Sequence, residues 1–363
     1  MFKNFFISRK SIVFTGAFIG IAAAILQKLG NPANMGICVA CMERDIAGAL
    51  GFHRATVVQY IRPEIIGFVL GSLIAALIFK EFKPRAGSAP LIRFFLGILA
   101  MIGSLVFLGC PWRALLRLAG GDGNALFGIA GLVAGILIGI FFIRSGYNLG
   151  RNQRTYPFTG WILPLVMVGL FLLLIFKPQL PTGAVFFSSE GPGSQYAPVL
   201  IAFIIALAIG FLAQRTRFCT VAAARDVILI KDTYLFTGVV SLLIAAWLGN
   251  VVLGQFNPGF QGQPIAHTSQ IWNFGGMVLA GLAFTLAGGC PGRQLFLSGE
   301  GDADAAVFVL GMIFGAGFAH NFATASSGSG PGAWGPAAVI VGLIICLIIG
   351  FSMSNIGKKE VSV

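Results

Sequence analysis

Charged residues are scarce in this sequence. Asp, Glu, Lys and Arg make up only 10% of the 363 residues, whereas hydrophobic residues make up 57%. A soluble globular domain carries roughly 25% charged residues. This composition excludes an ordinary soluble protein and indicates a chain that resides in a lipid bilayer.

Several functional motifs are also missing. No nucleotide-binding motif is visible, and the three histidines, His53, His267 and His320, share no spacing. The one Cys-x-x-Cys, formed by Cys38 and Cys41, has Ala222 at the second position of its later counterpart, so we expect no metal site and no cofactor. The basic residues are spread through short loops without an aromatic platform, so we expect no nucleic-acid partner.

Long apolar segments are what the sequence has in abundance. Ten of them are long enough to cross a hydrocarbon core about 30 Å thick, which predicts an all-α polytopic membrane protein. The segments are 12–29, 62–80, 91–109, 124–143, 158–176, 196–213, 235–254, 271–288, 304–320 and 336–353. The first has a basic flank but no convincing cleavage site, and we expect it to be retained.

The distribution of Lys and Arg predicts an orientation. When alternate loops are assigned to opposite sides, the side with both termini holds 17 basic residues and the other side holds 7. Cytoplasmic loops carry the excess of positive charge. We therefore expect both termini to be cytoplasmic.

The chain contains an internal repeat of about half its length. Gly-Cys-Pro-x-Arg ends one apolar segment at 109–113 and another at 289–293, and the two cysteines are 180 residues apart. "GICVACMERDI" likewise matches "RFCTVAAARDV", and Gly131 and Gly135 match Gly311 and Gly315. We expect a first membrane repeat at 1–176, an extracytoplasmic linker at 177–195 and a second membrane repeat at 196–363.

Five spans per half make the two halves enter the membrane from opposite sides. Such inverted repeats are common in transporters and place a substrate path at the interface of the halves. With the orientation given above, the first pair of cysteines, Cys38 and Cys110, is expected near the outer ends of its spans, and Cys219 and Cys290 near the inner ends. The segments "ICVACMERDIAGAL" and "PGRQLF" could instead enter the membrane as short re-entrant helices.

The repeated motif combines a helix break with a thiol and a fixed positive charge. The glycine is expected to end a helix, the proline to begin a short one and the arginine to favour an anion beside the new helix N-terminus. The residues concerned are Gly109, Cys110, Pro111 and Arg113, with Gly289, Cys290, Pro291 and Arg293. The alternative is a plain helix end with a cysteine packed as a small apolar residue.

The remaining cysteines fall into two groups. Cys38 and Cys219 each precede an Arg-Asp pair, 44–45 and 225–226, by six residues, and we interpret these pairs as local ion pairs that fix a re-entrant turn. Cys41 is either a further thiol on the path or half of a dithiol redox pair with Cys38. Cys346 has no counterpart in the first half, and we interpret it as a packing or lipid-facing residue.

The segments "GICVAC", "LGCPWR", "RFC" with "ARD", and "GGCPGR" resemble the YeeE/YedE family of bacterial inner-membrane sulfur-compound transporters, in particular its selenium-linked YedE branch. The resemblance implies an hourglass-shaped helical protein without enzymatic activity. It also implies uptake of thiosulfate or a selenium analogue along a row of thiols, with a cytoplasmic sulfur-carrier protein as a further partner. The implied path cysteines are Cys38, Cys110 and Cys290, to which the repeat adds Cys219.

Two functional classes stay open at this point. The first is a permease for a small sulfur or selenium anion. The second is a membrane thiol oxidoreductase that carries reducing equivalents through cysteine pairs. A purely structural membrane subunit would leave the repeated polar motifs without a purpose.

Overall fold

The computed structural model describes residues 6, 8–177 and 185–356. The long helices of its first half are α2 (Arg9–Lys28), α4 (Pro63–Ile78), α5 (Pro90–Phe107), α7 (Asn124–Arg144) and α8 (Pro157–Phe176). Those of its second half are α9 (Val199–Thr216), α11 (Tyr234–Val252), α12 (Gln270–Ala287), α14 (Ala303–Asn321) and α15 (Gly335–Ser352).

Short elements connect the long helices. Four short helices are α3 (Val39–Ala49), α6 (Pro111–Ala119), α10 (Thr220–Ile230) and α13 (Pro291–Gly299). A 3-10 turn covers Pro192–Ser194, and the two-residue strands β1 (Arg85–Ala86) and β2 (Gln153–Arg154) pair antiparallel. The sequence segments that were candidates for re-entrant helices are thus separate short helices, α3 and α13.

The prediction of an all-α polytopic membrane protein is confirmed. Nine helical segments of the described chain are long and apolar enough to cross a membrane, when a broken pair such as α5 and α6 is counted once. The tenth predicted span is α4, a shorter apolar helix. Each long helix coincides with one predicted apolar segment to within a few residues.

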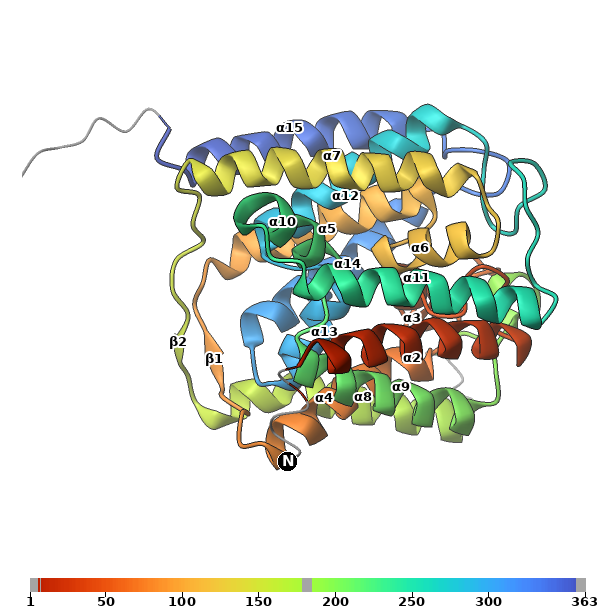
Figure 1. Cartoon of the computed structure of the whole chain (residues 1–363), viewed down its shortest axis with the longest axis horizontal. Coiled ribbons are helices and arrows are strands. Elements are labelled where there is room, and N and C mark those ends of the chain that lie inside the picture. Colours follow the sequence, from red (N-terminus) through yellow and green to blue (C-terminus); the bar gives the residue numbers. More distant parts are fainter. Residues whose placement is uncertain (1–5, 7, 178–184, 357–363) are drawn as a thin grey trace, which may run out of the picture.

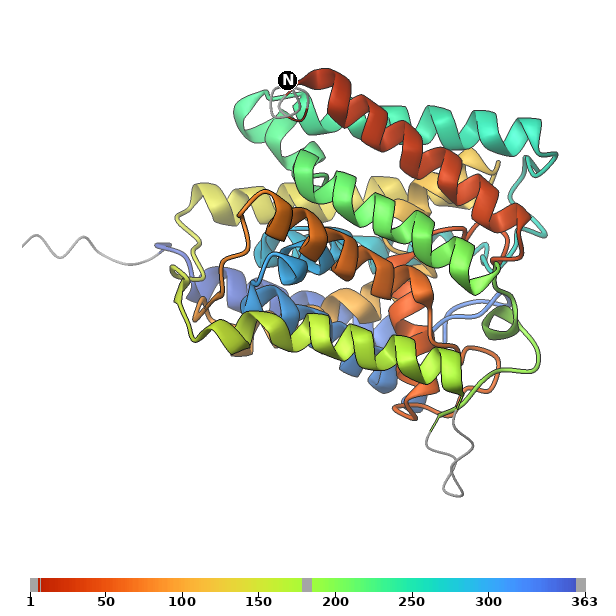
Figure 2. The same ribbon diagram turned by 90° about the horizontal axis from the view of Figure 1, so that it is seen from below.

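The two halves exchange partners in their packing. Helix α2 packs on α11, whereas α9, which opens the second half as α2 opens the first, packs on α4. In the same way α7 packs on α12 and α14 on α5, and α5 packs on α12 at the centre. Figure 2 shows α2 and α9 side by side, with α11 on the far side of α2. Two halves related by a two-fold axis would pack in this manner.

Glycines at matching positions of the repeat make equivalent close contacts between helices. A Cβ atom at Gly131 of α7 would collide with the carbonyl of Phe274 on α12, and one at Gly311 of α14 would collide with the carbonyl of Phe94 on α5. Small residues let helix backbones approach closely in lipid.

The division of the chain at 176 and 196 stays a prediction. Residues 1–5, 7, 178–184 and 357–363 of the predicted repeats and linker lie outside the described residues.

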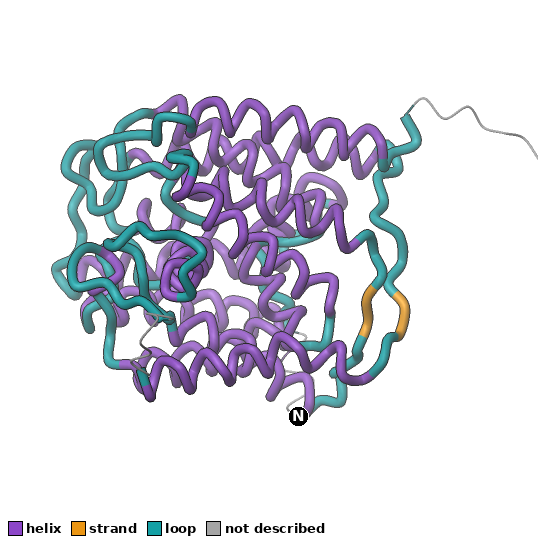
Figure 3. Tube along the Cα trace, turned by 180° about the vertical axis from the view of Figure 1, so that it is seen from behind, coloured by secondary structure: helices purple, strands orange, loops and turns teal. Residues whose placement is uncertain are grey.

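The short helices lie toward opposite ends of the molecule. In Figure 1, α3 and α6 lie toward the right, and α10 and α13 lie toward the left, where β1, β2 and the last turn of α15 are found. Figure 3 shows long loops gathered at the end opposite the strands. The long helices run between these two ends, so each half contributes a pair of short helices to a different end.

Candidate functional site

The first pair of cysteines joins two helix N-termini. Cys38 is the N-cap residue of α3, and its Sγ accepts a hydrogen bond from the Cys41 backbone N–H at 3.4 Å. Cys110 is the N-cap residue of α6, and its Sγ lies 3.8 Å from Cys38 Sγ. The chain thus brings together two thiols that are 72 residues apart, at a place where backbone N–H groups favour negative charge.

The second pair repeats this arrangement. Cys219 is the N-cap residue of α10, and its Sγ accepts hydrogen bonds from the backbone N–H groups of Ala222 at 3.4 Å and of Cys290 at 3.3 Å. Cys290 is the N-cap residue of α13. Each half therefore holds two thiols side by side at the start of two short helices. All four thiols are buried, so the structure encloses both pairs.

The motif forms a helix break, with one correction to the expected roles. Pro111 and Pro291 begin the short helices as predicted. In each copy, however, the residue in the left-handed conformation that ends the helix lies one position before the motif glycine. It is Leu108 at φ 64° in the first copy and Gly288 at φ 90° in the second. The prediction that the motif glycine ends the helix was therefore wrong by one residue.

The motif glycines instead make room for the motif arginines. A Cβ atom at Gly109 would lie 3.0 Å from Arg113 Cδ, and one at Gly289 would lie 3.2 Å from Arg293 Cγ. Both arginine side chains fold back across the break in the chain. The spacing of glycine and arginine in Gly-Cys-Pro-x-Arg is thus a packing requirement that both copies meet.

Arg113 is buried in a shell of carbonyl groups. Its Nη1 donates to the Leu108 carbonyl at 2.6 Å, its Nε to the Asn34 carbonyl at 3.1 Å and its Nη2 to the Ile265 carbonyl at 3.1 Å. These three acceptor residues all have positive φ, at 64°, 56° and 48°. Asparagine adopts this conformation readily, whereas for Leu108 and Ile265 it costs about 1–2 kcal/mol each. Two strained residues beside one guanidinium mark a place that the fold holds in position.

Cys41 belongs to the surroundings of this arginine. Arg113 Nη1 also donates to Cys41 Sγ at 3.3 Å. Cys41 is therefore linked to both the first thiol pair, through its backbone N–H, and the motif arginine, through its sulfur. The second half has no equivalent contact, because Ala222 occupies the corresponding position.

Both Arg-Asp pairs form the expected local ion pairs. Arg44 Nη2 lies 2.6 Å from Asp45 Oδ1, and Arg225 Nε lies 2.8 Å from Asp226 Oδ1. In the first half, Arg62 adds a second buried contact to Asp45 at 2.7 Å. The sequence analysis did not single out Arg62, which has no counterpart motif in the second half.

The structure also places Cys346, for which packing and lipid exposure were the two interpretations, and two of the histidines, for which the sequence predicts no role. Cys346 is buried, which supports packing over lipid exposure. The ring of His53 lies on that of His320, with centroids 4.4 Å apart, although the sequence spacing of the histidines carries no signal. His53 and His320 are far apart in the chain, and their segments meet where the residues after α3 pack on α14, for example where Asn321 Nδ2 donates to the Phe52 carbonyl at 2.9 Å.

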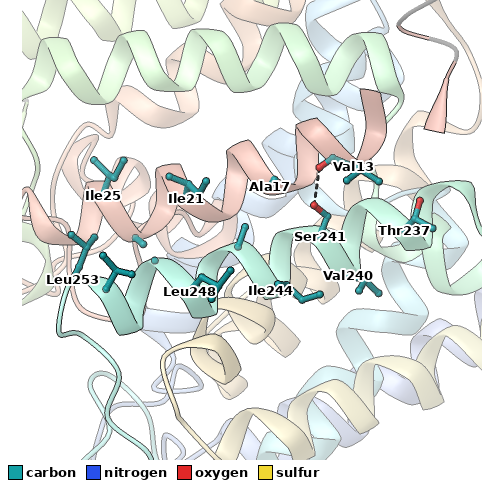
Figure 4. A pocket seen from close by; sticks show the side chains of 14 residues that line it. Val13, Ala17, Ile21, Ile25, Thr237, Val240, Ser241, Ile244, Leu248 and Leu253 are labelled. Carbon is teal, nitrogen blue, oxygen red and sulfur yellow. Dashed lines mark hydrogen bonds between the residues drawn. The ribbon is translucent and has the colours of Figure 1, made fainter. Parts of the chain in front are cut away.

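A large apolar groove lies away from the thiols. It is bounded by α2 and α11 and has a volume of about 780 Å³. Figure 4 shows its lining, which is aliphatic except for Thr237 and Ser241, and Ser241 Oγ donates to the Val13 carbonyl at 2.8 Å. Because side chains such as Val13 and Ile21 are exposed here, the groove belongs to the outer surface of the bundle. An anion would find no positive group in it.

Comparison with known proteins finds similarity to sulfur transporters. Residues 215–350, which contain Cys219, Cys290 and the second Gly-Cys-Pro-x-Arg, match the family model described as "Sulphur transport". The similarity to this family covers part of the second half of the chain. A curated relative, "Thiosulfate transporter TsuA" of Spirochaeta thermophila, is 36% identical over 103 residues. That match covers 27% of this chain and 29% of the relative's length.

Proposed function

We propose that the protein is a permease, and not an enzyme, for the uptake of a small sulfur- or selenium-containing anion, either thiosulfate or a selenium analogue. The observation that carries the proposal is the site that occurs twice: two buried thiols and an arginine at the start of a short helix. The matching family and the relative named a thiosulfate transporter support the same class of substrate.

The chemistry of the site suits transient binding of a soft anion. A thiol is a weak hydrogen-bond donor and its sulfur a weak acceptor. Helix N-termini and arginine supply positive potential without a tight bidentate cage. Permeation requires several such weak sites, because an ion that binds too tightly does not leave. Cys38, Cys110, Cys219 and Cys290 would serve as consecutive stations, with Cys41 beside the first pair.

We place the protein in a bacterial plasma membrane with both termini in the cytoplasm. The 17 to 7 division of Lys and Arg supports this orientation. The first and last described helices, α2 and α15, begin and end toward the same end of the molecule (Figure 1). A reporter that is active only in the periplasm, fused after the last residue, is expected to be inactive. An active reporter would contradict the orientation.

Uptake of a labelled anion tests the proposed function. Cells that express the full chain are expected to accumulate labelled thiosulfate, selenite or selenosulfate, and comparison of the three identifies the substrate. Cys110→Ala and Cys290→Ala are each expected to reduce uptake to background. Cys346→Ala is the matched control, because Cys346 is equally buried and lies outside the two thiol pairs.

Two results would contradict this proposal. One is the absence of uptake above that of cells without the protein for all three anions. The other is a Cys346→Ala variant as defective as Cys110→Ala, which would make cysteine burial a better explanation than substrate contact. In each case the amount of protein in the membrane has to be equal.

A thiol oxidoreductase is the second candidate, because Cys38 Sγ and Cys110 Sγ are only 3.8 Å apart. It would form a disulfide between them and release two protons and two electrons to a membrane electron acceptor such as a quinone. Alkylation of the thiols before and after oxidant separates the candidates. The permease requires reduced thiols during turnover, whereas the oxidoreductase requires a disulfide that forms and breaks.

A further inference from the structure

The two copies of Gly-Cys-Pro-x-Arg differ in their fourth residue. The first copy has Trp112 at this position, and the second copy has Gly292. No two amino acids differ more in side-chain volume. The two halves therefore cannot be symmetric here, although they match at the other positions of the motif.

The indole of the first copy occupies the space left by the glycine of the second. A Cβ atom at Gly292 would lie 3.2 Å from Trp112 Cζ2 and 3.4 Å from Cε2. The short helices α6 and α13 thus approach each other through this one ring. Any side chain at Gly292 would push against it.

Three phenylalanines surround the indole. The Trp112 ring centroid lies 5.7 Å from that of Phe218, 5.9 Å from that of Phe68 and 6.1 Å from that of Phe296. We call these four residues the aromatic plug. Phe218 immediately precedes Cys219, and Trp112 is two residues after Cys110. The plug therefore brings a residue close to Cys110 in the chain into contact with a residue next to Cys219.

The polar atom of this ring, the indole nitrogen, makes no hydrogen bond to the described part of the chain. Trp112 is 1% exposed, and its Nε1 has no hydrogen-bond partner among the described residues. A buried donor without a partner is destabilising. Phenylalanine would fill much of the same space without that cost. An indole at this position therefore points to an acceptor that reaches Nε1 only when the plug opens.

We propose that Trp112 is the gate between the two thiol pairs and a hydrogen-bond donor to the anion that passes it. This rests on the proposed permease function. In the closed state the ring lies on Gly292 and separates the pairs. When the ring swings away, its Nε1–H donates to an oxygen of the oxyanion on its way from Cys38 and Cys110 to Cys219 and Cys290.

Thiol accessibility tests the gate without any measurement of transport. A small membrane-impermeant thiol reagent is applied to intact cells that express the full chain, and alkylation of each cysteine is followed by peptide mass. With Trp112→Gly, reagent that enters from the side of the first pair is expected to alkylate Cys219 and Cys290 at least tenfold faster than in the wild type. An unchanged rate in a variant present in the membrane would overturn the gate.

Two further variants keep the test decisive if Trp112→Gly misfolds. Trp112→Leu keeps an apolar side chain of intermediate size and is expected to give an intermediate rate if Trp112→Gly fails to insert. The double variant Trp112→Gly, Gly292→Trp returns an indole to the same space from the opposite helix and is expected to restore slow alkylation. Fast alkylation in a well-inserted double variant would contradict a gate that works by filling this space.

Trp112→Phe tests the hydrogen bond separately from the gate. This variant is expected to keep wild-type alkylation rates, because a ring still covers Gly292, and to lower labelled thiosulfate uptake about fivefold to tenfold. Wild-type uptake would overturn the donor role. If the wild-type protein itself takes up no labelled anion, the permease proposal fails, but the alkylation rates still decide whether Trp112 separates the thiol pairs.

Discussion

The motif arginines of the two halves have different electrostatic surroundings. Arg113 is fully buried, its donors go to carbonyl groups and a thiol, and no carboxylate of the described chain lies within ion-pair distance of it. Arg293 instead pairs with Glu300, whose Oε1 lies 3.2 Å from Nη1. Glu300 also contacts Arg85 and Arg217. The motif arginine thus has no carboxylate partner among the described residues in the first half, whereas in the second half it shares one carboxylate with two other arginines.

This difference has a physical consequence for an anion. Carbonyl groups satisfy the hydrogen bonds of a guanidinium but leave its charge uncompensated, and an uncompensated charge acts strongly in a medium of low dielectric constant. Arg117, the other buried arginine of α6, is already paired with Asp122 at 2.6 Å. We therefore expect an anion to bind more tightly beside Arg113 than beside Arg293. Entry at the first pair and release at the second would follow.

The most damaging change is expected at the unpaired arginine. Arg113→Gln removes the only uncompensated charge that we assign to the first thiol pair, and we expect uptake efficiency to fall at least 100-fold, equivalent to ~2.7 kcal/mol. Arg113→Lys keeps the charge and is expected to recover part of the loss. Initial rates over a range of thiosulfate concentrations measure both variants. An Arg113→Gln variant no worse than Arg293→Gln would remove the electrostatic distinction between the halves.

A smaller effect is expected when the second arginine loses its partner. Glu300→Gln would leave Arg293 as unpaired as Arg113, so we expect an anion to be held more tightly at the second pair. Release would then be about tenfold slower, and KM and the maximal rate are expected to fall together. Glu81→Gln is the matched control, because Glu81 pairs with Arg215 and Arg217 and has no ion pair with Arg293. Equal behaviour of the two variants would contradict a specific role of Glu300.

The helices were predictable from the sequence, because apolar length alone reports a membrane span. The two thiol pairs were also within reach, since Cys38 and Cys110 recur at nearly the same spacing as Cys219 and Cys290. One copy of Gly-Cys-Pro-x-Arg would be a weak indication of a functional site, and its second copy makes the indication much stronger. The family resemblance agreed with residues that the repeat had already selected.

The electrostatic difference between the halves could not be predicted. Arg293 and Glu300 are seven residues apart and so lie on one face of α13, but this spacing does not show that the two side chains meet across two helical turns. The carbonyl shell of Arg113 comes from three separate segments whose backbone conformation is set by tertiary packing. The position of Trp112 on Gly292 likewise depends on how α6 meets α13.

The smallest expected effect is a pH dependence of the ion pairs that join Glu81 of the first half to Arg215 and Arg217 of the second. Burial alone would raise the pKa of Glu81, but hydrogen bonds from Arg215 and Gln214 and the charge of Arg217 outweigh it and hold the pKa below its ordinary value of 4.5. These pairs therefore stabilise the fold above about pH 4.5, and their contribution is lost as the pH falls through the lowered pKa. Glu81→Gln should cost less than about 1 kcal/mol at neutral pH.

Thermal unfolding of the purified protein in detergent measures this contribution. The melting temperatures of the wild type and Glu81→Gln are expected to differ slightly at pH 7 and to converge below pH 4. A difference that is constant down to pH 3 would mean that Glu81 acts through packing and not through its charge. The Arg113 site has no carboxylate partner, so no matching acid-sensitive ion pair is expected there.

Protection of the thiols by anions tests the central claim most directly. Cys110 and Cys290 are alkylated by an impermeant thiol reagent in intact cells and in inside-out vesicles, in the presence of thiosulfate or sulfate. We predict that thiosulfate slows alkylation of both thiols several-fold more than sulfate does, because it presents a soft sulfur to them, and that protection of Cys110 is the stronger. Equal protection by the two anions would contradict substrate recognition by the cysteines and leave only an electrostatic site at Arg113.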